Sequence, residues 1–227
     1  MVYCNYYIVR SGPAPQQLRQ GVLDLNQENR QMEAMRAAAL ARLARHTPQQ
    51  MAERAGVACK DNTFLFDTFG QRICVSLPSY TITPPLSAWH MLTLLHYLDL
   101  ADGTPVTGRT ITFSQYTDGL VRGGGFDRNA ELIVRRDLGP LGPEELTRRC
   151  AALGGELLAS NADFCARFWF APRYPLLLQI WFADDEFPAS GRLLLDESAP
   201  HYLTIEDAVT VGSLLLDTLT GAQHWTT

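Results

Sequence analysis

The polar residues of one apolar segment are the first place where this sequence could carry chemistry. Residues 86–101 are mostly Leu, Met, Ala and Trp, and they include His90, Thr93 and Tyr97. On a helix these three side chains fall within a stripe about 60° wide. A helix that is apolar on its other faces is expected inside a fold, where buried polar groups need partners. A ligand, a chain of water molecules or neighbouring backbone groups could each supply those partners.

His96 lies on another face of the same predicted helix, near Trp89. A histidine beside aromatic residues is typical of a hydrogen-bonded core residue, and the alternative is a ligand to a metal or cofactor. Together with His90, Thr93 and Tyr97, it defines one wall of a hypothetical site for a small cofactor.

An acidic turn is the second candidate. Asp184, Asp185 and Glu186 follow the apolar residues 175–182. Alternate side chains of an extended segment share a face, so Asp184 and Glu186 could act together, and Asp196 on the returning strand could join them. Such carboxylates suit a divalent metal ion or acid–base chemistry. The alternative is a solvated hairpin turn in which one carboxylate caps backbone amides.

A glycine run, residues 123–125, is the third candidate. Arg122 and Arg128 flank it, and Asp127 could cap a helix that starts there. Arg122 and the backbone at Gly124 could then cradle an anion at the helix N-terminus. A flexible lid and a plain loop are the alternatives.

Other reactive residue types give weaker patterns. The five cysteines are scattered without a CxxC pair, which indicates neither an iron–sulfur cluster nor a structural zinc site. There is no GxSxG motif for a nucleophilic serine. His201 could be a base or a surface residue, and Arg173 is expected to form an ion pair with Asp185 or Glu186.

Composition limits the classes of function. The 227 residues are 46% hydrophobic and 19% charged, which is typical of a globular domain. The net charge of −5, without a basic stripe, argues against nucleic-acid binding. No apolar run reaches the roughly 20 residues of a membrane span, and the first residues do not resemble a secretory signal. We therefore expect a cytoplasmic protein with reduced cysteines.

The local patterns predict the elements that must position these residues. Residues 1–26 are expected to be an irregular extension, and residues 27–227 a single domain. The predicted helices cover residues 27–46, 48–56, 86–101, 126–136, 143–153 and 204–219, and the predicted strands cover 63–66, 71–75, 110–113, 164–170, 175–182 and 192–195. This order indicates an α+β fold with a mixed, mainly antiparallel sheet, a buried central helix and flanking helices.

Three passages of the chain carry a likeness to a known family. They are residues 94–98 (LLHYL) with Ala101, Gly103, Pro105, Gly108 and residues 111–113 (ITF); the segment from Gly119 through Phe126; and residues 172–176 (PRYPL) with Trp181, residues 184–189 (DDEFPA), 195–196, 198–199 and 202–203. Over roughly residues 27–220 this set resembles the DUF3786 domain of anaerobic bacteria and archaea.

The resemblance implies little about activity, because the family has no established one. Some relatives carry an adjacent iron–sulfur segment similar to that of corrinoid iron–sulfur proteins, and the cysteines of such a segment are absent here. What the resemblance implies is a link to corrinoid, tetrapyrrole or anaerobic redox metabolism.

Three functional hypotheses follow from these observations. The first is a protein that binds a small ligand or cofactor, such as a tetrapyrrole or corrinoid, along the helix at residues 86–101. The second is a metal-assisted hydrolase or lyase built on Asp184, Glu186 and Asp196. The third is an interaction module, a homodimer for example, formed through the amphipathic residues 27–46.

Overall fold

The computed structural model describes residues 15–221, with side chains described from residue 29 onward. The chain divides after Ala38 into a smaller and a larger unit. Helix α1, Pro15–Leu43, starts in the first unit and ends in the second. The expectation that residues 15–26 are irregular is wrong, since Pro15 suits a first helical turn and Gln, Leu and Arg then favour the helix. Residues 1–14 of the expected extension lie outside the described part.

The remaining helices follow the caps and breakers of the sequence. In α2, Thr47 and Gln50 form a capping box, and Gly56 ends the helix, where the prediction had it end, with a left-handed φ of 70°. Thr204 caps the last helix. The α-helices of the larger unit after α1 are α2 (Pro48–Ala55), α3 (Ala88–Leu100), α4 (Arg122–Ile133), α5 (Gly142–Ala152) and α6 (Ile205–Thr220). Short helical turns are η1 (Phe113–Gln115), η2 (Val134–Leu138), η3 (Gly139–Leu141) and η4 (Ala199–His201).

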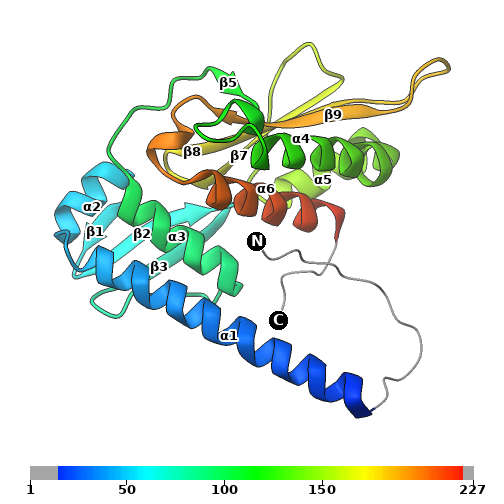
Figure 1. The fold of residues 1–227 in the computed structure, drawn as a ribbon. Coiled ribbons are helices and arrows are strands. Elements are labelled where there is room, and N and C mark those ends of the chain that lie inside the picture. Colours follow the sequence, from blue (N-terminus) through cyan, green and yellow to red (C-terminus); the bar gives the residue numbers. More distant parts are fainter. Residues whose placement is uncertain (1–14, 222–227) are drawn as a thin grey trace. The chain divides into compact units, whose positions relative to one another are not determined.

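Two antiparallel sheets form, where one was expected, and the predicted α+β class is confirmed (Figure 1). The first sheet has the order β1-β2-β3-β4, and its strands are β1 (Ala58–Lys60), β2 (Thr63–Thr68), β3 (Gln71–Ser76) and β4 (Thr81–Thr83). The second has the order β5-β9-β8-β7-β6, with strands β5 (Thr110–Ile111), β6 (Glu156–Leu157), β7 (Phe164–Ala171), β8 (Tyr174–Trp181) and β9 (Ser190–Asp196).

Helices cover one face of each sheet and bury the core. Helix α3 packs on the buried face of the first sheet, where His90 contacts Thr68 and Phe69 of the β2–β3 hairpin. Its residues 92–95, 97 and 98 are buried, which agrees with the predicted central helix. On the second sheet, α4 packs against β9, α5 against β6, and α6 against both of these helices.

A narrow joint connects the two sheets. The Phe69 amide in the β2–β3 turn donates a hydrogen bond of 2.8 Å to the Trp169 carbonyl of β7. Beside it, the backbone of Gly70 lies against that of Gly154, so closely that a Cβ on Gly70 would be 2.6 Å from the Gly154 nitrogen. Both glycines have positive φ, 74° and 65°. The joint therefore needs glycine at both positions, for the space and for the backbone conformation.

Replacing Gly70 with alanine should destabilise the fold through this joint. The added methyl group meets backbone atoms, and alanine at positive φ costs energy of its own, so we expect a loss of at least about 2 kcal/mol in the free energy of unfolding. Gly125 is the control, because it lies inside α4 with open space around its Cβ position. Gly125→Ala should stabilise by about 0.5–1 kcal/mol. Urea denaturation measures both, and equal effects would contradict the role of the joint.

Candidate functional site: a groove between the two sheets

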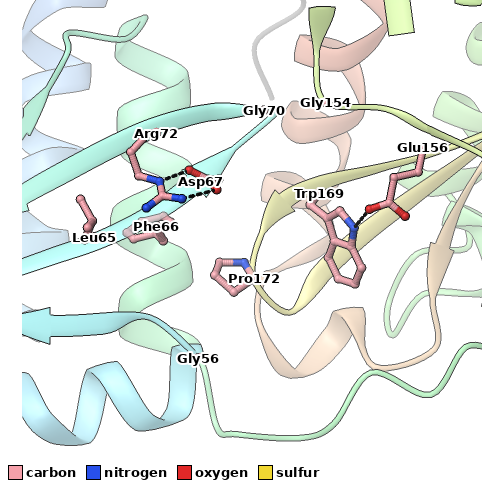
Figure 2. Close-up of a pocket in the computed structure, with 10 residues that line it drawn as sticks. All are labelled: Gly56, Leu65, Phe66, Asp67, Gly70, Arg72, Gly154, Glu156, Trp169 and Pro172. Atoms are coloured by element: carbon pink, nitrogen blue, oxygen red, sulfur yellow. Dashed lines mark hydrogen bonds and ion pairs between the residues drawn. The ribbon is translucent and has the colours of Figure 1, made fainter. Parts of the chain in front are cut away.

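A groove of about 450 Å³ opens where the two sheets meet. Its volume lies within the roughly 300–1,000 Å³ that is usual for small-molecule sites. Figure 2 shows side chains from the two sheets around this space. The lining residues are Gly56, Leu65, Phe66, Asp67, Gly70, Arg72, Gly154, Glu156, Trp169 and Pro172.

The wall from the first sheet carries a cross-strand ion pair. Asp67 and Arg72 stand directly opposite each other on β2 and β3. The Arg72 guanidinium donates to both carboxylate oxygens of Asp67, one of them at 3.0 Å. Strand alternation sends Phe64 and Thr68 into the core and leaves Leu65 and Asp67 on the outer face, where the groove lies.

The wall from the second sheet has the same type of pair and an indole ring. Glu156 and Arg167 are register partners on β6 and β7, with an N–O distance of 2.5 Å. The Trp169 indole N–H donates to the other oxygen of Glu156 at 3.2 Å, as Figure 2 shows. The Arg167 guanidinium lies 5.3 Å from the centre of the Trp169 ring. These contacts fix both the carboxylate and the half-buried indole in place.

Electrostatics keep Glu156 ionised. The hydrogen bond from Arg167 lowers the pKa of the Glu156 carboxyl, more than its slight burial raises it. An ionised carboxylate accepts hydrogen bonds and cannot serve as a general acid. The groove thus presents fixed acceptors on both walls, a guanidinium donor from Arg72 and an aromatic surface.

His90 of the predicted polar stripe is enclosed by protein groups. Its Nε2 atom lies 2.7 Å from the Thr68 hydroxyl oxygen. Its ring stacks on Phe170 at 5.5 Å between centres and meets Phe69 at 5.7 Å. Burial lowers the pKa of His90 to about 4, so the imidazole is neutral at physiological pH. The stripe lies on the buried face of β2, where Thr68 points. Leu65 and Asp67, which line the groove, are on the opposite face of this strand.

The other polar residues of α3 also have protein partners. The Thr93 hydroxyl lies 3.0 Å from the carbonyl oxygens of both Trp89 and His90. The Tyr97 hydroxyl donates to the Ala55 carbonyl at 2.6 Å. His96 Nδ1 lies 2.7 Å from Asp207 Oδ1 on α6. The partners of Thr93 and Tyr97 are neighbouring backbone carbonyls, one of the three sources considered for the stripe. His90 instead contacts a side-chain hydroxyl, and the cofactor hypothesis stays a prediction.

The glycine run forms the first turn of α4, where an open loop had been expected. A Cβ on Gly123 would lie 1.9 Å from the Phe113 carbonyl oxygen, so the glycine permits close packing of α4 on η1. Asp127 accepts from the Phe113 and Ser114 amides, and thus caps η1 instead of its own helix. Arg122 pairs with Glu206 at 2.8 Å. Gly124, one position further, meets the Ser114 side chain at ordinary contact distance.

The acidic residues are not brought together. Asp184 accepts from the Glu186 and Phe187 amides and so closes its own turn, which agrees with the alternative of a capped hairpin turn. Asp196 lies at the other end of β9 from this turn. Across the side chains that the structure describes, no group of three or more His, Cys, Asp or Glu is arranged to hold a metal ion.

Asp196 anchors the loop that follows α3. Its buried carboxylate accepts from the Thr107 amide and hydroxyl, the Gly108 amide, and the Ser198 amide and hydroxyl. Burial raises the pKa of this carboxyl, but the hydrogen bonds outweigh it and the net shift is downward. Asp196 is therefore an ionised structural residue that accepts five hydrogen bonds.

Parts of the first and third segments that carry the family resemblance meet around Arg173. Its amide donates to the Tyr97 hydroxyl at 3.1 Å, and its guanidinium donates to the Gly103 carbonyl at 2.6 Å. Tyr97 in turn stacks on Tyr202 at 5.5 Å. The expected ion pair between Arg173 and the acidic turn is wrong. Nearby, His201 Nδ1 lies 2.7 Å from Asp102 Oδ2, and both side chains are half exposed.

Comparison with known proteins identifies the family. The model of the domain of unknown function DUF3786 matches residues 47–218, and the chain belongs to this family. No curated protein and no solved structure matches the chain. Within the described residues, no helix has both the length and the hydrophobicity of a membrane span.

The groove residues were missed by the sequence reasoning. Asp67 and Arg72 come from β2 and β3, whereas Glu156 and Trp169 come from β6 and β7, a pair of strands far away in the chain. Alternation along residues 63–68 could have placed Asp67 on an exposed face. No local pattern could have placed Glu156 and Trp169 beside it, because that depends on how two sheets meet.

The half-buried, neutral His90 predicts a dependence of stability on pH. Its folded-state pKa of about 4 is below the unfolded value near 6.5, so the unfolded chain binds the extra proton between these values. The free energy of unfolding should fall as pH decreases from about 6.5 to 4, by up to about 1.4 kcal/mol per pH unit from this residue. Denaturation of the native chain and of His90→Gln at several pH values measures this contribution to the free energy of unfolding. Parallel pH profiles for the two would contradict the prediction.

Proposed function

We propose that this DUF3786 protein binds a small molecule in the groove between its two sheets. The observation that carries the proposal is the Trp169 indole, half-buried and held in place beside the Glu156 carboxylate in a hollow of about 450 Å³. Aromatic rings with a few fixed polar groups are typical of ligand sites. A surface that served only to cover the core would not need an ordered carboxylate on each wall.

The groove is a better candidate than the α3 helix for binding. The polar atoms of His90, Thr93 and Tyr97 make hydrogen bonds to protein groups, and a ligand there would have to replace them. In the groove, by contrast, the side chains of Asp67 and Arg72 are at least half exposed. A ligand can therefore reach them without breaking the core.

The proposal also includes the metabolism in which the protein acts and its location in the cell. The family resemblance supports a role in anaerobic metabolism, and the four described cysteines, which form no disulfide, agree with a cytoplasmic location. A homodimer formed through residues 27–46 stays a further hypothesis. The metal-dependent hydrolase draws no support from Asp184 and Asp196, which already accept hydrogen bonds from the backbone.

Fluorine NMR tests where small molecules bind. Labelling with 5-fluorotryptophan gives each of the four tryptophans a signal, and Trp169→Phe assigns the one of interest. Screening a library of soluble metabolites should yield compounds that shift the Trp169 signal in a saturable way. Trp169→Ala should weaken their binding at least about tenfold, because the main apolar contact is lost.

Trp181 provides a matched control for this experiment. It is also half-buried on the second sheet, with the Arg192 guanidinium 5.4 Å from the centre of its ring, but it does not line the groove. Trp181→Ala should leave binding unchanged. The proposal fails if no compound shifts the Trp169 signal, or if the compounds that bind shift Trp181 instead.

A further inference from the structure

We infer that the ligand of the groove is a neutral sugar or another cyclic polyol; this inference rests on the proposed function. It follows from three properties of the groove: acceptors on both walls, compensated charge, and an apolar surface between them. Each of these properties narrows the chemistry of the ligand.

The acceptors require a ligand with hydrogen-bond donors on more than one side. Both oxygens of Asp67 accept from Arg72, and the two oxygens of Glu156 accept from Arg167 and Trp169 respectively. A carboxylate has about four acceptor positions, so each group keeps some for a ligand. Because the two carboxylates belong to opposite walls, the donors must be spread around the ligand.

The balance of charge favours a neutral molecule. Asp67 and Glu156 contribute two negative charges, and their partners Arg72 and Arg167 contribute two positive charges. A cation or an anion would therefore gain little over a neutral ligand. A hydroxyl group suits such pairs, because it donates to a carboxylate oxygen and accepts from the neighbouring guanidinium at the same time.

The apolar surface of the groove favours a ligand that contains a ring. Trp169, Leu65 and Pro172 line the groove. Figure 2 shows Pro172 and the Trp169 indole between the Asp67–Arg72 pair and Glu156, and Leu65 on the other side of Asp67 and Arg72. A sugar ring has a face of C–H groups and an edge of hydroxyls. Its face can cover the exposed apolar atoms while its edge reaches the carboxylates, and removing both apolar surfaces from water favours binding.

The experiment uses neutral probes and the fluorotryptophan-labelled full-length chain. The polyol probes are methyl glucopyranoside, methyl galactopyranoside, methyl mannopyranoside and myo-inositol, and adenosine, guanosine and glycine represent the competing classes. At least one polyol should shift the Trp169 signal in a saturable way. Asp67→Asn and Glu156→Gln should each weaken the affinity for that polyol about tenfold or more, since a charged acceptor is lost with little change in shape.

Glu145→Gln is the matched control, because Glu145 is held by Arg148 and Arg149 outside the groove. It should leave the affinity for the polyol unchanged. Circular dichroism confirms that each variant is folded.

The outcomes separate this inference from the proposed function. If adenosine, guanosine or glycine shifts Trp169 and no polyol does, the ligand class is wrong and the groove remains a binding site. If polyol binding survives both carboxylate substitutions, the polyol inference is overturned as well. If neither these probes nor the metabolite library shifts Trp169, both the inference and the proposed function fail.

Discussion

The contact between the backbones of Gly70 and Gly154 is the constraint on which the rest of the larger unit depends. It lets the β2–β3 turn approach β7 closely enough for the Phe69 amide to bond the Trp169 carbonyl. Two sheets with separate hydrogen-bonding ladders are thereby held together where the β2–β3 turn meets β7, and the space beside the joint becomes the groove. The core helices fill the opposite side, so the same joint separates the internal polar stripe of α3 from the external surface.

Local signals made a good part of this fold predictable. Thr47, Pro48 and Gly56 mark a short helix by chemistry that acts within a few residues, and the structure has the cap and the left-handed terminus that they imply. The number of sheets was not predictable in the same way. Strand β5 pairs with β9 across more than eighty residues, and nothing in the sequence of either strand specifies that partner. Similarly, the glycines at 123–125 indicate a loop by propensity, but they form the first turn of α4, where Gly123 packs against the Phe113 carbonyl.

The candidate site was less predictable from the sequence than the fold. The sequence identified polar positions on α3 and left backbone groups open as their partners, which is what Thr93 and Tyr97 have, whereas His90 contacts the Thr68 side chain. Asp184 likewise closes the turn that had been considered for it. The groove residues carry no motif. Each of their charged pairs results from register, with Asp67 opposite Arg72 and Glu156 opposite Arg167, and their proximity results from the joint. Register and packing between sheets are global properties, so composition and periodicity do not reveal them.

The division of the groove between two sheets has a thermodynamic consequence. A molecule that touches both walls binds only when the sheets are joined, so its binding free energy is added to the free energy that holds them together. At a hundredfold excess over its Kd, such a ligand would contribute about 2.7 kcal/mol. This is comparable to the effect of a severe point mutation, and it could offset damage at the joint itself. Occupancy of the groove and cohesion of the two sheets are, in this sense, linked equilibria.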